Sequence, residues 1–365
     1  MAHEGARPGR HSTRLGLGLI SALLVALIGL SGSVAAAATG GPHASTGVGP
    51  LWLNLPENLA PSYRYGIAFA YDNTSHEAVL FGGAFTPSVG GDIPFGDTWT
   101  FKNGVWTNIT AKLSVAPSAR VGATLTYDAA DGYLVLFGGL GGVNGQYVLS
   151  DTWKFQNNHW TNITAAHGPS ARSDSGMTYD SATNEVLLFG GCLNTACSVG
   201  GHDLWSFHQG KWSKVVLTGS VPAGRADASF AFDPALNATV LFGGWTTAAR
   251  YSDTWEFVNG AWTKVHGSVH PSPRLAATMA YDPAINALVL FGGKYLGHFY
   301  SDTWEFRAGA WTNVSSKLPG APYDRGYEMM TYDPLMGMGS IVMFGGQTWF
   351  PGTLDDTWLF TTLGP

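Results

Sequence analysis

The residues best suited to chemistry in this sequence are two cysteines and one loop histidine. Cys192 and Cys197 are the only cysteines, and four residues separate them. His202 is nearby, but this spacing with a single histidine makes a poor zinc site. In an exported chain, such a pair is typical of a disulfide that closes a small loop and contributes roughly 2 kcal/mol to stability. We therefore predict a disulfide between Cys192 and Cys197.

His298 is the best single candidate for acid–base chemistry, because it lies in a loop rich in aromatic residues. Asp253 and Asp302 could orient it, but both belong to a motif that recurs along the chain. A lone loop histidine is more often a contact residue than a catalyst. The sequence contains no Gly-x-Ser-x-Gly, no His-Glu-x-x-His and no glycine-rich phosphate loop with lysine. We predict no catalytic residue, no metal site and no cofactor, and we leave enzymatic activity open while leaning against it.

A repeated structure must position these residues, because two motifs recur about every 50 residues. Phe-Gly-Gly ends a short apolar strand six times, and Asp-Thr-Trp follows each copy, with Leu replacing Thr once. The tryptophans of the second motif are spaced 54, 52, 50, 49 and 54 residues apart. A repeat of this length with four strands per unit is typical of a β-propeller. In the second unit we predict strands over 122–127, 133–137, 151–155 and 160–163. The six tryptophans are Trp99, Trp153, Trp205, Trp255, Trp304 and Trp358.

The sixth unit lacks its fourth strand, and a matching segment lies at the other end of the repeats. Only seven residues follow Trp358. The segment 51–55, Leu-Trp-Leu-Asn-Leu, parallels the fourth strand of the first unit at 105–109, Val-Trp-Thr-Asn-Ile. We predict that this N-terminal strand completes the last blade, which locks the ring and leaves no exposed sheet edge. The predicted fold is all-β, a six-bladed β-propeller forming one domain over residues 50–361.

The repeated unit resembles the kelch repeat. The family pattern is an arginine before strand one, Gly-Gly at the end of strand two, an aromatic residue in strand three and a tryptophan opening strand four. All six units carry this pattern, over roughly 85% of the chain. The resemblance implies four-stranded kelch blades like those in the central domain of galactose oxidase. The arginines are Arg64, Arg120, Arg172, Arg225, Arg274 and Arg325, and the strand-four tryptophans are Trp106, Trp160, Trp212, Trp262, Trp311 and, across the closure, Trp52.

Some kelch propellers are enzymes, so the resemblance leaves a carbohydrate-active oxidase or epimerase as an alternative. The galactose oxidase family builds its copper site from two histidines and two tyrosines, one of them cross-linked to a cysteine. Here both cysteines share one short loop, and no Tyr-His pair occurs in the chain. Ser-Asp-Thr-Trp at Ser150, Ser252 and Ser301 is faintly similar to the sialidase Asp-box, but the intervening glycine of that motif is absent.

Residues that recur in every blade are expected to serve packing. The arginines and the aspartates of Asp-Thr-Trp should meet on the face of the Gly-Gly ends, so we predict partly buried ion pairs. The alternative is a basic ring that binds an anion. A second set of aspartates, in the turns between strands one and two, should cap its own backbone. Calcium is the weaker alternative, because ligand oxygens do not recur at alternate positions. This set comprises Asp72, Asp128, Asp180, Asp233, Asp282 and Asp333.

Function is expected where the blades differ, in the loops between strands two and three. The loops of blades four to six are rich in aromatic residues, which suit the apolar faces of sugars or a protein surface. Packing of the loops against the blades explains the same residues equally well. The candidate ligand-binding residues are Trp245, Tyr251, Tyr295, His298, Tyr300, Trp349 and Phe350.

The N-terminus is typical of an exported protein. Three arginines precede an uncharged apolar run over 15–30, and small residues follow it as far as Ala38. We predict a cleaved signal peptide over 1–38, with an uncleaved membrane anchor as the alternative, a linker over 39–49 and a tail over 362–365. Export would make five Asn-x-Ser/Thr sequons candidates for glycosylation, unless Asn and Thr merely suit a wet outer strand. The sequons lie at Asn73, Asn108, Asn162, Asn237 and Asn313.

Composition narrows the class of function. Charged residues make up 12% of the chain and its net charge is −6, which argues against a nucleic-acid binder with a broad basic face. We predict a monomeric binding module, secreted or anchored at the cell surface, that recognises a protein or a glycan through the strand 2–3 loops. Membrane contact would involve only an uncleaved N-terminal segment. The alternatives are the carbohydrate-active enzyme and a structural component of a surface layer.

Overall fold

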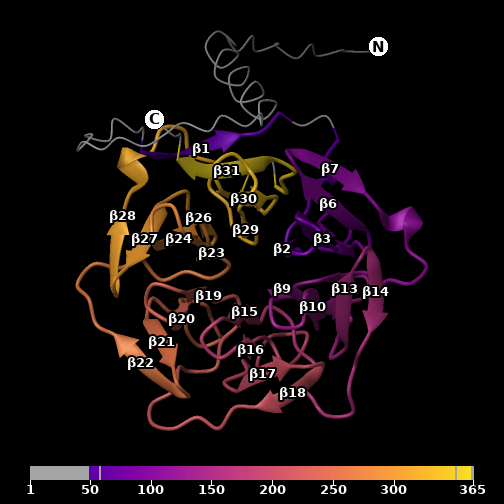
Figure 1. Cartoon of the computed structure of the whole chain (residues 1–365), viewed down its shortest axis with the longest axis horizontal. Helices are drawn as coiled ribbons and strands as arrows, with labels where there is room; N and C mark the ends of the chain where they lie inside the picture. Colours follow the sequence, from indigo (N-terminus) through magenta and orange to yellow (C-terminus); the bar gives the residue numbers. More distant parts are fainter. Residues whose placement is uncertain (1–48, 57–58, 350–351, 363–365) are drawn as a thin grey trace, which may run out of the picture. The chain divides into compact units, whose positions relative to one another are not determined.

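The computed structural model describes residues 49–56, 59–349 and 352–362, and these form a ring of four-stranded antiparallel sheets (Figure 1). Six such sheets occur in this part of the chain, so the predicted six-bladed propeller is confirmed. The predicted leader, all but the last residue of the linker, Phe350 and residues 363–365 lie outside the described residues. Within the described ranges, no helix is long and apolar enough to cross a membrane.

Each blade is a meander whose first strand lies nearest the centre of the ring and whose fourth lies at the rim (Figure 1). Blade 1 comprises β2 (Ala68–Asp72), β3 (Glu77–Phe81), β6 (Thr98–Lys102) and β7 (Val105–Asn108). Blade 2 comprises β9 (Thr124–Asp128), β10 (Tyr133–Phe137), β13 (Thr152–Gln156) and β14 (His159–Asn162). Blade 3 comprises β15 (Gly176–Asp180), β16 (Glu185–Phe189), β17 (Leu204–His208) and β18 (Lys211–Lys214).

The remaining blades repeat the same order. Blade 4 comprises β19 (Ser229–Asp233), β20 (Ala238–Phe242), β21 (Thr254–Val258) and β22 (Ala261–Val265). Blade 5 comprises β23 (Thr278–Asp282), β24 (Ala287–Phe291), β27 (Thr303–Arg307) and β28 (Ala310–Asn313). Blade 6 comprises β29 (Met329–Asp333), β30 (Ser340–Phe344), β31 (Thr357–Thr362) and β1 (Pro50–Asn54). Short loop elements are β4 (Ala84–Phe85), β5 (Ile93–Pro94), β8 (Arg120–Val121), β11 (Leu140–Gly141), β12 (Tyr147–Val148), β25 (Lys294–Tyr295), β26 (His298–Phe299) and the 3₁₀ helices η1 (Thr110–Lys112) and η2 (Ser315–Lys317).

The two ends of the propeller meet in blade 6, as the sequence predicts. Strand β1 pairs with β31 in antiparallel register, so that Trp52 lies opposite Phe360. The Trp52 side chain is 2% exposed, and its indole N–H donates to the Thr303 hydroxyl of blade 5 at 3.0 Å. This strand therefore joins the first described residues to the last blade and covers an edge that would otherwise be unpaired.

Each strand-four tryptophan fills the seam between its own blade and the preceding one. The Trp160 ring lies 4.9 Å from Phe155 in blade 2 and 5.3 Å from Phe81 in blade 1, measured between ring centroids. Its indole N–H donates to the Thr98 hydroxyl of blade 1 at 3.0 Å. Four further seams contain the same bond, namely Trp106 to Thr357, Trp212 to Thr152, Trp311 to Thr254 and Trp52 to Thr303. The repeated threonine of Asp-Thr-Trp thus satisfies a buried donor of the next blade.

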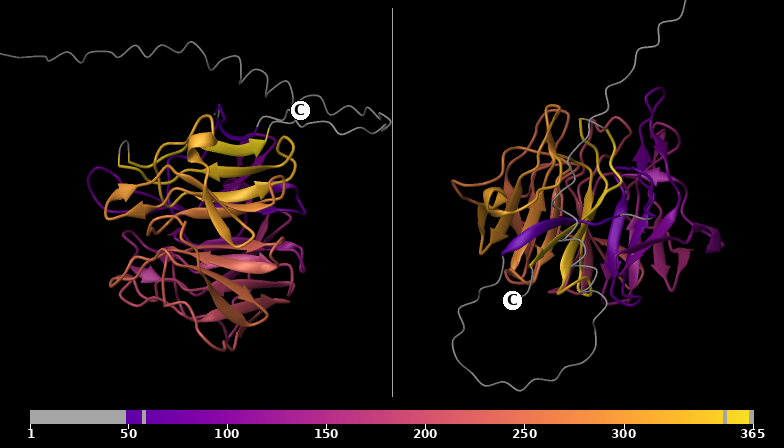
Figure 2. Two further views of the ribbon diagram at one scale, coloured as in Figure 1. Left: turned by 90° about the vertical axis from the view of Figure 1, so that its left-hand side faces the viewer. Right: turned by 90° about the horizontal axis from the view of Figure 1, so that it is seen from above.

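The strands run through the thickness of the ring, so its loops gather on two faces (Figure 2). We name the side that carries the strand 2–3 loops the loop face. On the opposite side, each turn aspartate accepts backbone N–H groups of its own turn, as the Asp72 carboxylate does from Thr74 at 2.8 Å. The equivalent bonds are made by Asp128, Asp180, Asp233, Asp282 and Asp333. The predicted capping role is confirmed for this set.

Candidate functional site

The repeated arginines lie buried beneath the loop face in matched ion pairs. In blade 1, Nη1 and Nη2 of Arg64 contact the two carboxylate oxygens of Asp97 at 2.6 and 2.9 Å. Nη1 also donates to the Gly82 carbonyl, and Nε donates to the Ser62 carbonyl. The other blades repeat the pair as Arg120–Asp151, Arg172–Asp203, Arg225–Asp253, Arg274–Asp302 and Arg325–Asp356. All six arginines are at most 1% exposed and bond within their own blade, so they stabilise its loop end and offer no basic ring to an anion.

In three of the blades, the ion pair lowers the pKa of the paired aspartate. Burial alone would raise the pKa of Asp203, but hydrogen bonds from Arg172 and the Trp205 indole outweigh it and bring that pKa to about 2. The same bonds lower the pKa of Asp151 and Asp253 against the effect of burial. In all six blades the strand-three tryptophan donates its indole N–H to its own blade's aspartate. The Arg–Asp–Trp unit is therefore a structural feature of every blade.

Two of the seven candidate aromatic residues cover these arginines. The Tyr251 ring centroid lies 3.9 Å from the guanidinium carbon of Arg225, and the Tyr300 ring lies 4.1 Å from that of Arg274. Phe95 occupies the same place over Arg64 in blade 1. Because Tyr251 and Tyr300 are half-buried at a position that recurs in another blade, their contacts favour packing over ligand binding.

Trp245 connects the disulfide to the centre of the ring. The disulfide between Cys192 and Cys197 is present, and both cysteines pack with Ala226 against the Trp245 ring. The Trp245 indole N–H donates to the carboxylate of Asp227 at 2.6 Å. The guanidinium carbon of Arg250 lies over the same ring, 4.6 Å from its centroid. This candidate is therefore a half-buried residue that positions a central carboxylate.

The remaining described candidates, Tyr295, His298 and Trp349, lie where the loops of blades 5 and 6 meet. Strands β25 and β26 form a hairpin with Tyr295 opposite His298, and Leu296 at its tip is 72% exposed. Trp349 of blade 6 is 79% exposed. A Cβ added to Gly297 in the hairpin tip would lie 3.8 Å from the Trp349 ring, so the two loops are in close proximity. We name Leu296 and Trp349 the rim patch. Phe350, the last candidate, lies outside the described residues.

A ring of backbone hydrogen bonds surrounds the centre of the loop face, and sequence reasoning missed it. Each member lies two residues after a repeated arginine, and its N–H donates to the carbonyl oxygen of the equivalent residue in the adjacent blade at 2.8–2.9 Å. All members have φ between +51° and +66°. We name these residues the mouth ring: Gly66, Gly122, Asp174, Asp227, Ala276 and Tyr327. Four of the six are not glycine, so these blades accept a costly left-handed backbone to place a side chain there.

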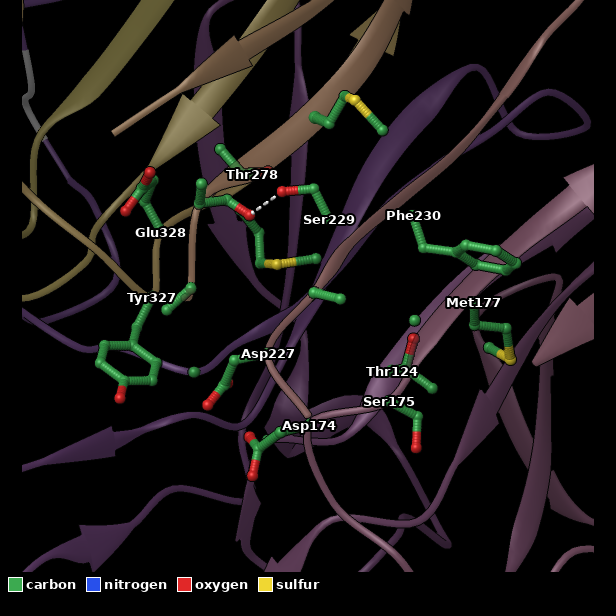
Figure 3. Close-up of a pocket in the computed structure, with 18 of the residues that line it drawn as sticks. Thr124, Asp174, Ser175, Met177, Asp227, Ser229, Phe230, Thr278, Tyr327 and Glu328 are labelled. Carbon is green, nitrogen blue, oxygen red and sulfur yellow. Dashed lines mark hydrogen bonds between the residues drawn. The ribbon is translucent and has the colours of Figure 1, made fainter. Parts of the chain in front are cut away.

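The side chains of the mouth ring line a central cavity. Figure 3 shows the side chains of Asp174, Asp227 and Tyr327, which precede the first strands of their blades, together with Ser229, Met177 and Phe230, which lie in such strands. The cavity volume is about 110 Å³, room for several water molecules or a small polar group. Ser173 Oγ donates to Asp174 at 2.7 Å.

Glu328 also lines this cavity and is an exception among its repeat equivalents, which are Ile67, Ala123, Ser175, Ala228 and Ala277. The Glu328 side chain is 1% exposed, and neither carboxylate oxygen has a hydrogen-bond partner within the described part of the chain. Burial raises the pKa of Glu328 to about 8. A buried polar group without a partner is costly, so this residue is not explained by packing.

Burial shifts the other acids of the cavity in the same direction. It raises the pKa of Asp174 to about 6. Burial and the neighbouring charge of Asp174 raise the pKa of Asp227 well above its usual value, and burial does the same to Tyr327. Comparison of the residues two and three positions after each repeated arginine would have revealed these side chains, because most of the twelve residues in this series are small or apolar.

The strand-four sequons have a structural role of their own. The side-chain oxygen of Asn108 accepts the backbone N–H of Thr110, whose hydroxyl bonds the backbone of Thr98. Asn162 with Thr164 and Asn313 with Ser315 repeat this arrangement. All five sequon asparagines are exposed, and their glycosylation stays a prediction. No group of three or more His, Cys, Asp or Glu side chains able to hold a metal ion occurs within the described ranges.

Comparison with known proteins agrees with the repeat pattern and the architecture. The KLHDC2/KLHL20/DRC7 Kelch-repeats domain matches residues 68–268, more than half of the chain. The fold is similar to that of YjhT, with a TM-score of 0.63 and 17% sequence identity, covering 85% of this chain and 99% of that one. At this identity the likeness concerns the fold alone. With six Arg–Asp–Trp units and a ring closed by its N-terminal strand, the chain belongs to the kelch-repeat family of β-propellers.

Proposed function

We propose that this protein is a binding module, working outside the cell or at its surface, that recognises a protein or glycan through the loop face. Kelch propellers generally mediate protein interactions, which supports the general class. The disulfide between Cys192 and Cys197 is compatible with an oxidising compartment. The predicted signal peptide or anchor lies outside the described residues and remains part of this proposal.

The rim patch is the observation that carries the proposal. Tryptophan is the residue type that most often dominates binding energy at interfaces, and Trp349 exposes 79% of its surface. Leu296 adds a second exposed apolar side chain from the adjacent blade. Blade cores bury their own tryptophans almost completely, so packing of the propeller does not require this ring. Tyr295 and His298 lie in the same hairpin and extend the surface with polar groups.

The test compares two double variants of the purified protein as baits. Leu296→Ala with Trp349→Ala removes the rim patch. Leu335→Ala with Met338→Ala removes two exposed apolar side chains from a turn on the opposite face and serves as the matched control. Cell-surface and culture material would supply protein partners, and a glycan array would supply sugars.

We expect wild type and control to retain the same partner and the rim-patch variant to lose it by roughly thirtyfold, a typical hot-spot effect. Retention on the array alone would identify a glycan, and retention of a polypeptide alone would identify a protein. Equal retention by both double variants, with unchanged circular dichroism, would overturn the assignment of the loop face.

A further inference from the structure

The mouth of the central channel combines three features that the rim patch does not explain. It holds two neighbouring carboxylates, Asp174 and Asp227, from blades 3 and 4 (Figure 3). It holds an aromatic wall, in which the Tyr327 ring centroid lies 5.9 Å from that of Tyr65. It also contains the buried and unpartnered carboxyl of Glu328.

Neither aspartate forms an ion pair within the described part of the chain. Every repeated Arg–Asp pair is in direct contact, whereas no lysine or arginine in the described part of the chain lies within ion-pair distance of Asp174 or Asp227. Their hydrogen-bond donors are neutral groups, the Ser173 hydroxyl and the Trp245 indole. Like charges in a partly buried site repel one another, so a positive group placed between them would be stabilised.

Charged and titratable groups around the pair come from four blades. Arg250 of blade 4 stacks on Trp245, and Lys294 of blade 5 lies 5.9 Å from the Tyr327 ring. The other groups are Tyr65 and Asp92 of blade 1 and Tyr327 and Glu328 of blade 6. Lys294 would compete with an added cation for this site, because it approaches the same aromatic ring and acts electrostatically on Asp227.

We propose that the mouth ring binds an organic cation, a primary ammonium or a guanidinium group, between the carboxylates of Asp174 and Asp227 and against the ring of Tyr327. Carboxylates give strong charge-assisted hydrogen bonds to such groups, and an aromatic face attracts them. The cavity of about 110 Å³ has room for a group of this size. A basic side chain of a protein or an amino sugar could supply such a terminal cation.

Isothermal titration calorimetry on the whole protein tests this with defined probes. Nα-acetyl-lysine methylamide and Nα-acetyl-arginine methylamide represent a protein source, and glucosamine represents a sugar source. Nα-acetyl-norleucine methylamide and N-acetylglucosamine are their uncharged counterparts. We expect saturable binding of at least one cation and at least tenfold weaker binding of its uncharged counterpart.

Three variants give effects of different sign. Asp174→Asn with Asp227→Asn should weaken binding by about tenfold or more, because the two carboxyl groups that would accept from the cation are lost. Lys294→Met should strengthen it, because an internal competitor is removed. Asp355→Asn, which removes an exposed carboxylate from the blade 6 loop, should leave it unchanged. Lowering the pH from 7.5 to 5 should weaken binding by about tenfold, because Asp174 then carries a proton.

Absence of saturable binding by all three cations, or equal binding by the Asp174→Asn, Asp227→Asn variant, would overturn the proposal. This inference goes beyond the proposed function, which concerns a protein or glycan partner of the loop face. Small free probes test cation binding at the mouth ring without any such partner. A rim-patch variant that loses its partner but still binds the cation would separate the two sites. Loss of cation binding alone would leave the loop-face proposal standing.

Discussion

Blade 3 carries Leu204 where each of the other five blades carries threonine, and the consequence lies in the neighbouring blade. The indole N–H of Trp262 in blade 4 is buried and has no hydrogen-bond partner within the described part of the chain. In the other seams the threonine hydroxyl accepts this bond at 2.9–3.0 Å. A buried donor without an acceptor costs about 1–3 kcal/mol. We predict that Leu204→Thr restores the bond and couples energetically to Trp262.

The single substitution alone cannot reveal that bond. Leu204 is fully buried in the cluster that contains Trp262, and exchanging it for threonine removes roughly two buried carbon groups, about 1.6 kcal/mol or more. This loss is of the same size as the gain from the new hydrogen bond, so the net change should be small. A double-mutant cycle with Trp262→Phe separates the two, because phenylalanine lacks the N–H.

Guanidinium unfolding, followed by fluorescence and circular dichroism to test for coincident transitions, measures the cycle. Trp262→Phe should cost about 1–2 kcal/mol more in the Leu204→Thr background than in wild type. The reverse cycle uses Thr152 of blade 2 and Trp212 of blade 3, as Thr152→Leu with Trp212→Phe. It should show the same coupling, because the native chain has the indole-to-hydroxyl hydrogen bond at that seam. If the Leu204–Trp262 coupling lay within 0.3 kcal/mol of zero while the Thr152–Trp212 coupling was clear, the assignment of a missing hydrogen bond to Leu204 would be refuted.

Two further predictions concern pH. The pKa of Asp203, about 2, lies below its unfolded value of roughly 3.9, so its stabilising contribution is full above pH 4 and is lost as the pH falls towards 2. The Asp203→Asn variant should therefore lose on the order of 2 kcal/mol at pH 7 but differ little from wild type near pH 2, as unfolding curves at both pH values would show. The contribution of Glu328 to stability changes with pH in the opposite direction, because its folded pKa of about 8 lies above the unfolded value. Glu328→Gln should thus be more stable than wild type at pH 8, and this advantage should disappear below about pH 5. If the variant were less stable than wild type at pH 8, the Glu328 carboxyl would not be a buried group without a partner.

The sequence predicts the scaffold well because each repeated residue makes the same contact in every blade. Six arginines and six aspartates recur at fixed offsets, and a buried charge needs a partner of opposite sign. Each arginine does form an ion pair with the aspartate of its own blade. The predicted strands of blade 2 agree with the observed ones to within two residues, with 133–137 reproduced as β10. The closing strand was predictable for the same reason, since the missing Trp of blade 6 had one counterpart, Trp52.

The loop residues were harder to interpret, because an aromatic side chain can pack or bind at the same position. Tyr251 and Tyr300 both lie two residues before the repeated aspartate, where blade 1 has Phe95. That periodicity was the available signal for a packing role, and the stacking on Arg225 and Arg274 explains it. Trp349 has no such counterpart, and its exposure could be established only from the structure.

The mouth ring shows how a symmetric scaffold can carry an asymmetric site. Its six inter-blade hydrogen bonds involve only backbone atoms and hold positive φ in every blade, so glycine would satisfy the scaffold throughout, as it does at Gly66 and Gly122. Asp174, Asp227 and Tyr327 therefore add conformational cost without adding a bond to the ring itself. Two of the three also bring a charge into a partly buried place, which adds a desolvation cost. These costs accumulate at one end of the channel, and they are better explained by what the channel binds than by what the propeller needs to fold.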